Sequence, residues 1–298
     1  MGFIDDIKTE YRIGGIVQRL IFWNVGLFAI PLILFSLLRL GGVQLPGLDW
    51  TIPGTSNWFS ISSNPADLLW KPWTLITYAF LHEGFLHLFF NMLWLFFAGR
   101  LFLTFFTQKQ FFGLYILSAI FAGLIFIGSY QVIPMLVGTT VSMVGASAAI
   151  MAVLIATAVY APQYEVRLML IGTVRLWHIA GVFIVLDLIN VSVANSGGHI
   201  AHLSGALFGL IYIKLLQNGT DLSKGVSAVI DFFANLFKPK KATPFKKVHK
   251  NSTPPRATAP KAQDMTQKQI DHILDKISQS GYDSLTKEEK EFLFKVGK

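Results

Sequence analysis

The longest stretch of this sequence without a charged side chain runs from Gln110 to Tyr164. Only 14% of all residues are charged and 53% are hydrophobic, whereas soluble domains carry about 25% charged residues. Apolar runs of about 20 residues are long enough to cross a bilayer as helices. The composition and the long apolar runs therefore predict an all-α, polytopic membrane protein.

Six apolar stretches fit this length. The first is uncharged and exceeds the core of a signal peptide, and no small-residue cleavage site follows it, so we expect it to be retained. The six expected helices are Leu20–Leu38, Gly84–Phe106, Gln110–Tyr130, Met143–Tyr160, Val174–Asn195 and Ile200–Leu216. Between the first and second, residues 41–81 are rich in Gly, Pro, Ser and Trp. This composition predicts a long irregular loop whose tryptophans lie at the membrane interface.

Positive charge is concentrated on alternate connections. Arg100 and Lys109 lie in one short connection, Arg167 and Arg175 lie in another, and seven Lys or Arg residues without an acidic residue follow in 238–256. The positive-inside rule therefore predicts that both termini are cytoplasmic. We expect a multi-pass protein of a bacterial inner membrane, in which the basic segment faces anionic lipid and binds no nucleic acid.

The chain divides into four expected regions. Residues 1–19 form a cytoplasmic N-terminal segment and 20–217 the six-helix membrane domain. Residues 218–263 comprise an amphipathic segment and a basic, Pro-containing flexible linker, and 264–298 form a small two-helix cytoplasmic appendage. The appendage has no candidate catalytic group and no motif that indicates a partner.

Four polar residues are expected at similar depth on the outer side of the membrane. His87 and Asn91 lie near the start of the second span, Ser147 near the start of the fourth and His202 near the start of the sixth. Polar groups at membrane depth are costly and mark functional sites by default. A hydroxyl, two imidazoles and an amide are the groups that nucleophilic attack on a carbonyl requires.

Three motifs carry these residues. They are Gly145-Ala146-Ser147, then His82 and His87 with Asn91, and Ala201-His202-Leu203-Ser204-Gly205-Ala206-Leu207-Phe208-Gly209. In this order and on these spans they closely resemble the rhomboid intramembrane serine proteases, over about residues 15–217. The Lys-rich linker and two-helix tail are similar to an extension found on some bacterial rhomboids.

The resemblance implies a six-transmembrane-helix rhomboid-like bundle and a serine endopeptidase that cleaves transmembrane-helix substrates near the outer membrane face. Ser147 would be the nucleophile and His202 the general base, as a dyad without an orienting acid. His87 and Asn91, supported by Gly145 and the backbone N–H of the nucleophile, would hold the oxyanion. No cofactor and no metal are implied.

Helix packing supports the same pairing from the residues themselves. Gly205 and Gly209 form a GxxxG surface on the face that carries His202, and such surfaces permit close backbone approach. The fourth span offers a matching row of small residues, Ala148, Ala149, Ala152 and Ala156. Tight packing of these two faces would bring His202 close to Ser147.

Other polar residues are expected outside the dyad. We interpret Asp187 as structural or as lining an inner cavity, and His82 as an anchor of the outer loop. His199 follows Ser196-Gly197-Gly198, which indicates a loop, so we expect it at the water-accessible mouth of the sixth span.

The sequence departs from the common rhomboid pattern at three positions. Thr74 follows Trp73 where many members have Arg, so the outer loop must be anchored differently. Ala148 follows the nucleophile where many have Gly. Met151 stands where an aromatic ring often supports the histidine, and it would orient that histidine less firmly.

Two other functions compete with the protease. A catalytically silent relative that binds membrane clients would be expected to lack Ser147 or His202, and both are present. A metal or haem site built from His82, His87, His199 and His202 would leave the serine, Asn91 and the glycine pattern as coincidence.

Overall fold

The computed structural model describes residues 2–43, 58–168, 172–236 and 262–296 of the chain. It comprises two compact units, residues 1–238 and 239–298. The first part of the expected outer loop (44–57, with Trp50) and most of the expected linker (237–261) lie outside the described residues.

Two helices open the first unit. Helix α1 (Phe3–Ile13) carries Asp5 and Asp6 in its first turn and Arg12 in its last, an arrangement that complements the helix dipole. It was not predicted, because the mixed charges there obscure the helical pattern. Helix α2 (Ile16–Leu40) extends the first expected span at both ends.

The outer loop is less irregular than the composition predicts. It contains strand β1 (Ile61–Ser62), helix α3 (Pro65–Trp70), helix α4 (Thr74–Thr77) and the 3-10 turn η1 (Tyr78–Phe80). Asn64 and Pro65, which indicate a loop in the sequence, instead begin helix α3. The side chain of Asn64 accepts a hydrogen bond from the N–H of Ala66, and Pro65 occupies the first helical position.

Hydrogen bonds around Trp73 fasten the loop where the sequence lacks the usual Trp-Arg pair. The indole N–H of Trp73 donates to the carbonyl of Trp58 (2.7 Å), and the hydroxyl of Thr77 donates to the carbonyl of Phe59 (2.7 Å). Thr74 is buried and its hydroxyl donates to the carbonyl of Lys71 (2.7 Å). Thr74 and Thr77 thus take part in anchoring the loop.

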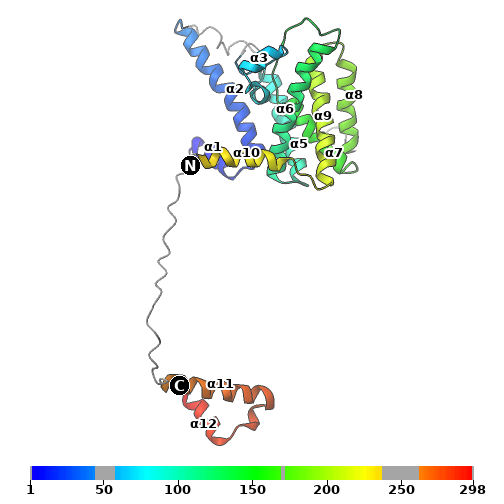
Figure 1. Cartoon of the computed structure of the whole chain (residues 1–298). Helices are drawn as coiled ribbons and strands as arrows, with labels where there is room; N and C mark the ends of the chain where they lie inside the picture. Colours follow the sequence, from blue (N-terminus) through cyan, green and yellow to red (C-terminus); the bar gives the residue numbers. More distant parts are fainter. Residues whose placement is uncertain (1, 44–57, 169–171, 237–261, 297–298) are drawn as a thin grey trace. The chain divides into compact units, whose positions relative to one another are not determined.

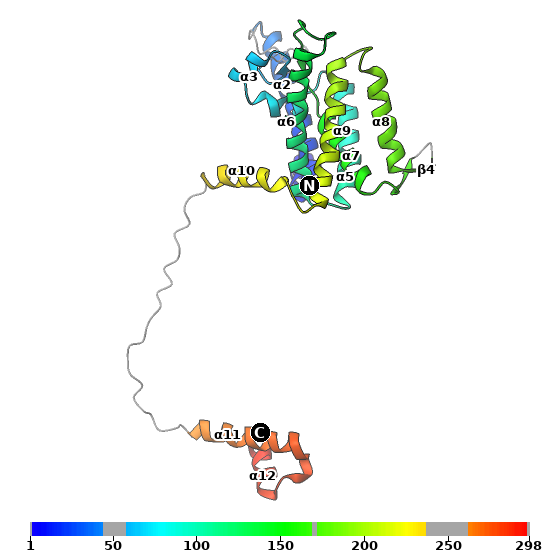
Figure 2. The same ribbon diagram turned by 45° about the vertical axis from the view of Figure 1, so that its right-hand side comes forward.

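A bundle of apolar helices follows the loop (Figures 1 and 2). Its members are α5 (Phe85–Leu103), α6 (Gln108–Val132), α7 (Ser147–Tyr160), α8 (Leu176–Asn190) and α9 (Ser196–Gln217). Helix α7 is the core of the bundle: every residue from Ala148 to Ala158 is buried, and it packs against α5, α6, α8 and α9. Ser147, its first residue, is thus held by the most constrained element of the fold.

Short strands connect the helices. Strand β2 (Ser142–Met143), immediately before α7, pairs antiparallel with β1 of the outer loop. Strands β3 (Glu165–Leu168) and β4 (Gly172–Arg175) form a hairpin between α7 and α8. Helix α9 begins at Ser196, four residues before the expected start, so Ser196-Gly197-Gly198 forms helix and not loop.

That early start has a packing reason. A Cβ atom at Gly197 would lie 2.6 Å from a ring carbon of Phe126 and 2.9 Å from the hydroxyl of Tyr130. The side chain of Asn195, a residue in the left-handed region (φ 48°), accepts the N–H of Gly198 as an N-cap. Gly197 therefore permits close contact with α6, and neither glycine breaks the helix.

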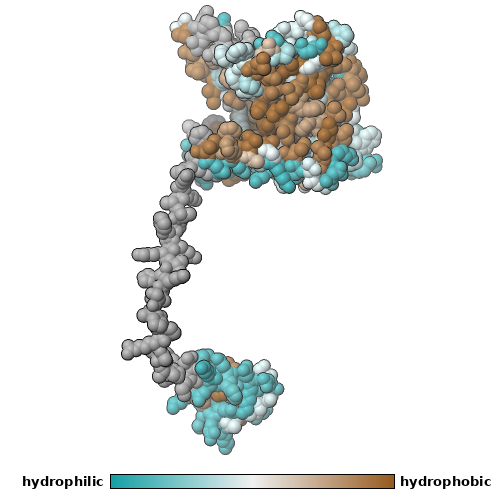
Figure 3. Space-filling view, in the orientation of Figure 1, coloured by the Kyte–Doolittle hydropathy of each residue, from teal (hydrophilic) through white to brown (hydrophobic). Residues whose placement is uncertain are grey.

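The first unit has the exterior of a membrane protein. Figure 3 shows a broad hydrophobic band over its helices, bounded by more hydrophilic residues. In the described part of the chain, α2, α5, α6 and α9 are long and apolar enough to cross a bilayer, whereas α7 and α8 are apolar but shorter. The 14 residues of α7 rise about 21 Å. The expected span is longer because residues 143–146 precede the helix in non-helical conformation.

Helix α10 (Ser223–Leu236) closes the first unit and lies crosswise to the bundle helices (Figures 1 and 2). Its first residue, Ser223, packs against Gly113 of α6, where a Cβ would overlap the serine. Beyond it the apolar side chains Val229, Ile230, Phe232, Phe233 and Leu236 are exposed. This exposed apolar stripe fits the predicted amphipathic segment at a membrane surface.

The second unit contains helices α11 (Ala262–Ser280) and α12 (Lys287–Val296), joined by the 3-10 turn η2 (Tyr282–Ser284). The expected helix pair is present, although α11 begins four residues before Thr266. Thr286 and Glu289 form the predicted capping box, and Lys276 forms an ion pair with Glu289 (2.9 Å).

Candidate active site

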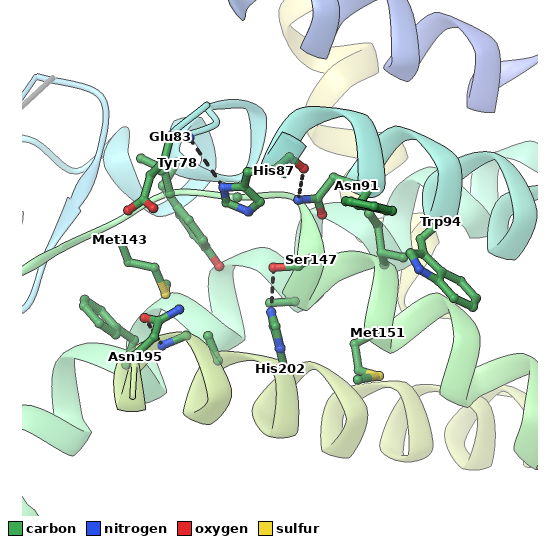
Figure 4. A pocket seen from close by; sticks show the side chains of 18 of the residues that line it. Tyr78, Glu83, His87, Asn91, Trp94, Met143, Ser147, Met151, Asn195 and His202 are labelled. Carbon is green, nitrogen blue, oxygen red and sulfur yellow. Dashed lines mark hydrogen bonds between the residues drawn. The ribbon is translucent and has the colours of Figure 1, made fainter. Parts of the chain in front are cut away.

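A cavity of about 800 Å³ is lined by residues of α5, α6, α7, α8 and α9 and of the segments that precede α5 and α7. Figure 4 shows Ser147 and His202 at its centre, with His87 and Asn91 on the facing helix. Apolar side chains such as Phe90, Trp94 and Phe183 line much of the remainder. A concave apolar site with a few convergent polar groups is the usual form of a binding or active site.

Ser147 owes its position to the turn that precedes α7. The backbone of Gly145 has φ +135°, a conformation that residues other than glycine rarely adopt. Its N–H donates to the carbonyl of Tyr78 (2.9 Å), which fixes the turn to the outer loop. Because Ser147 is the first helical residue, its backbone N–H has no partner within the helix and lies at the positive end of the helix dipole.

His202 reaches Ser147 across the tightest helix contact in the bundle. Its Nε2 lies 2.7 Å from Oγ of Ser147. About one turn after His202, a Cβ at Gly205 would overlap the carbonyl oxygen of Ala148. About two turns after it, a Cβ at Gly209 would overlap the carbonyl oxygen of Ala152. The GxxxG surface thus packs directly on the row of alanines in α7, as the residue pattern predicts.

His87 and Asn91 lie on one face of α5. The N–H of Glu83 donates to Nδ1 of His87 (3.4 Å), so the other ring nitrogen, Nε2, carries the proton in the neutral ring. This Nε2 is beside the turn, 3.0 Å from where a Cβ of Gly145 would lie. The side-chain amide of Asn91 donates to the carbonyl of His87 (2.9 Å) and retains a second N–H.

Asp187 differs from expectation. Its carboxylate is on the last turn of α8, and Oδ1 lies 2.9 Å from Nδ1 of His202 and 2.7 Å from Nδ1 of His199. Asp187 was expected to be structural or to line an inner cavity; instead it lies against the candidate histidine and is not among the residues that line the cavity. The only hint in the sequence was a lone acidic residue in an apolar span.

His199 differs from expectation in part. It occupies the first turn of α9 and is only partly exposed, with Nδ1 bonded to Asp187. Water alone does not satisfy its ring nitrogens. Its place in the first turn of α9, with 22% of the side chain exposed, agrees with the expected position at the mouth of the span, whereas the bond to Asp187 was not expected.

His82 is buried, and neither of its ring nitrogens has a hydrogen-bond partner among the described residues. Burial is the main cause that lowers the pKa of His82 to about 3, and repulsion from His87 is the second cause. Its ring packs edge-on against that of His87, with centroids 5.1 Å apart. His82 thus supports His87 through ring packing.

Met151 lines the same cavity on α7 and is buried. In the described part of the chain, the side chains close enough together to hold a metal ion are those of Asp187, His199 and His202. His82 and His87 do not belong to that group, so the four histidines considered from the sequence do not form one metal site.

Two cavity residues were not singled out from the sequence. The carbonyl of Tyr78 holds the turn before Ser147, and the ring lines the cavity. Asn195, the N-cap of α9, also lines the cavity. An Asn just before Ser196-Gly197-Gly198, a residue type common at N-caps, was the available signal for Asn195, and none pointed to Tyr78.

The fold and the site define an integral membrane protein with a serine–histidine contact between two closely packed helices, α7 and α9. The model of the rhomboid domain matches residues 69–218, half of the chain. The chain therefore belongs to the rhomboid family, an intramembrane-protease-like family whose members act on transmembrane substrates within the bilayer. A family of unknown function, DUF6576, matches residues 261–296. No curated protein matches the chain.

Proposed function

We propose that this chain is a serine endopeptidase that hydrolyses peptide bonds of transmembrane-helix substrates near the outer membrane face. The observation that carries the proposal is the 2.7 Å contact between Oγ of Ser147 and Nε2 of His202. A serine hydroxyl is a weak nucleophile until a base takes its proton. The contact supplies that base inside an apolar cavity.

The chemistry follows from the geometry. Nε2 of His202 accepts the hydroxyl proton while Oγ attacks the carbonyl carbon, and the resulting imidazolium returns the proton to the leaving amine. An acyl-enzyme remains on Ser147. A water molecule, deprotonated by the same nitrogen, then hydrolyses the ester and regenerates the hydroxyl.

Three donors are available to the developing oxyanion. They are the backbone N–H of Ser147, Nε2–H of His87 and the second amide hydrogen of Asn91, all at the same cavity. Donors held in a site from which water is excluded stabilise a transition state by a few kcal/mol each, on the order of 2.7–4 kcal/mol. Glycine at position 145 leaves room for the oxygen beside His87.

The membrane arrangement belongs to the same proposal. Six helices, α2 and α5–α9, cross the membrane with both termini cytoplasmic, in a bacterial inner membrane. Basic side chains at the α5–α6 and α7–α8 connections support this orientation. A substrate helix must unwind locally, because helical peptide carbonyls are shielded by their own hydrogen bonds, so we expect substrates with Gly, Ala or Pro near the outer end.

The experiment is labelling by a serine-directed phosphonate, together with cleavage of a model transmembrane substrate in liposomes. Wild type should be labelled and should cleave, and Ser147→Ala should do neither while remaining folded. Ser118→Ala is the matched control, since that buried hydroxyl donates to the carbonyl of Tyr115 and lies outside the cavity. A wild type that binds the substrate but is neither labelled nor active would identify a silent client-binding protein.

A further inference from the structure

We propose that Asp187 is a positioning residue for His202, so that the site works as a Ser147–His202–Asp187 relay in which a single carboxylate oxygen holds two histidines. This inference rests on the proposed peptidase function and deepens it. It departs from the dyad without an acid that the resemblance implies.

The carboxylate of Asp187 is built into the site. Its side chain is 7% exposed, and Oδ1 lies 2.9 Å from Nδ1 of His202 and 2.7 Å from Nδ1 of His199. Its other oxygen, Oδ2, has no hydrogen-bond partner among the described residues. The contacts to the two imidazoles therefore compensate this buried carboxylate, and an unpaired carboxylate at such a position is costly.

The contacts fix which nitrogen of His202 carries the proton. An ionised carboxylate only accepts hydrogen bonds, and each of its oxygens can accept two of them. Oδ1 therefore accepts an N–H from Nδ1 of each histidine. In neutral His202 the proton is then on Nδ1, and the lone pair of Nε2 faces Oγ of Ser147 at 2.7 Å.

The same contact stabilises the charged state that forms during attack. When Nε2 takes the serine proton, the imidazolium has a carboxylate 2.9 Å from its far nitrogen. The carboxylate remains ionised, and it orients the ring and balances its charge without taking the proton. Without Asp187, the other tautomer would present Nε2–H to the serine and could not act as a base.

His199 has a different part in this arrangement. Its ring centroid lies 5.9 Å from that of His202, and it is the second donor to Oδ1. Removing His199 leaves the His202 contact in place, whereas removing Asp187 takes the acceptor from both rings. The two substitutions therefore have unequal effects on turnover.

The first experiment compares Asp187→Asn, Asp187→Glu and wild type on the model substrate in liposomes. We expect Asp187→Asn to lower kcat on the order of 10²–10⁴-fold with KM unchanged, as loss of tautomer control does in serine proteases. Asp187→Glu should restore part of the rate. Asn190→Ala is the control on the same helix, since that exposed side chain bonds only the carbonyl of Leu186 in the described structure and should leave kcat at the wild-type value.

A double-mutant cycle separates positioning from general support. Asp187→Asn should cost nothing further in a His202→Ala background, because the ring it positions is gone. An equal loss in both backgrounds, or a wild-type kcat in Asp187→Asn, would overturn the inference. Wild type and Ser147→Ala are measured alongside. Cleavage by wild type and its loss in Ser147→Ala would support the peptidase function whatever the result for Asp187→Asn.

A measurement on the unsubstituted protein covers the case in which Asp187→Asn does not fold. The 15N chemical shifts of the His202 ring, assigned by comparison with His202→Ala, report its tautomer. We expect a protonated Nδ1 and an unprotonated Nε2 at neutral pH. The opposite tautomer would contradict the relay.

Discussion

Gly205 of α9 packs against the backbone of Ala148 in α7, so closely that a single methyl group would overlap the carbonyl oxygen of Ala148. Ala148 adjoins Ser147, and Gly205 lies three residues after His202. The distance between the hydroxyl and the imidazole is therefore set by the contact of two helix backbones. The spacing of the two helices at the site is thus fixed by their backbones, whereas Asp187 orients the imidazole ring.

Gly205→Ala tests that contact. The added methyl should force α9 away from α7 and lower the free energy of unfolding by about 1–3 kcal/mol, the usual cost of overpacking. Peptidase activity should fall by a larger fraction than the free energy of unfolding does. Gly181→Ala in α8 is the matched control, because nothing lies within 4 Å of its added Cβ. Thermal unfolding in detergent and cleavage rates measure both. Equal melting temperatures and rates for the two variants would show that the helices are not in close contact.

His202→Ala should lower kcat by at least about 10³-fold, because the general base and the orientation of the hydroxyl are lost together. His199→Ala should reduce the rate only modestly, since His199 contacts Asp187 and has no contact with the serine. Cleavage of the model substrate by purified variants measures both effects. The reverse order of severity would make His199 the base.

Asn91→Ala should lower turnover by about 10²–10³-fold, the usual effect of removing one oxyanion donor. His87→Ala should act in the same direction, and the double variant should lose less than the product of the single effects, because both donors serve one charge. Single-turnover rates at saturating substrate measure the effect. Wild-type rates in both single variants would leave the pair with a structural role only.

The folded protein should lose stability as the pH falls below about 6.5, in part through His82. Its pKa is lowered to about 3 by burial, whereas the unfolded value is about 6.5. The unfolded chain therefore binds a proton over this window that the folded chain does not, so His82 destabilises the fold progressively from pH ~6.5 toward pH ~3. The fall in melting temperature between pH 7.5 and 5 should be smaller in His82→Leu. An identical fall in both proteins would mean that His82 is protonated in the fold.

Truncation after Phe237 should preserve peptidase activity on a model substrate, because the second unit carries no candidate catalytic group and forms a separate compact unit. Cleavage and phosphonate labelling of full-length and truncated protein measure this. The control is Ser147→Ala in the truncated form, which should be inactive. A truncated protein that folds but neither cleaves nor labels would show that the appendage regulates the site.

The sequence by itself determined the class of protein and the pairing of the central residues. Apolar runs specify membrane helices because the pattern is read directly against bilayer thickness. The GxxxG surface and the alanine row predicted which faces of α7 and α9 meet, because small residues alone permit backbone contact. The spacing of Thr286 and Glu289 also predicted the capping box, and apolar residues at helical spacing predicted the helix of residues 223–236.

Only the tertiary structure decided how polar groups from different helices meet. The sequence does not give the rotation of α8 about its axis, because that span is apolar on nearly every face, so Asp187 could not be directed toward His202 in advance. The start of α9 was misjudged for a related reason: Gly197, which indicates a loop locally, is required by the rings of Phe126 and Tyr130 on α6. Helix identity follows from local pattern, whereas the partners of a buried carboxylate depend on packing between residues far apart in the chain.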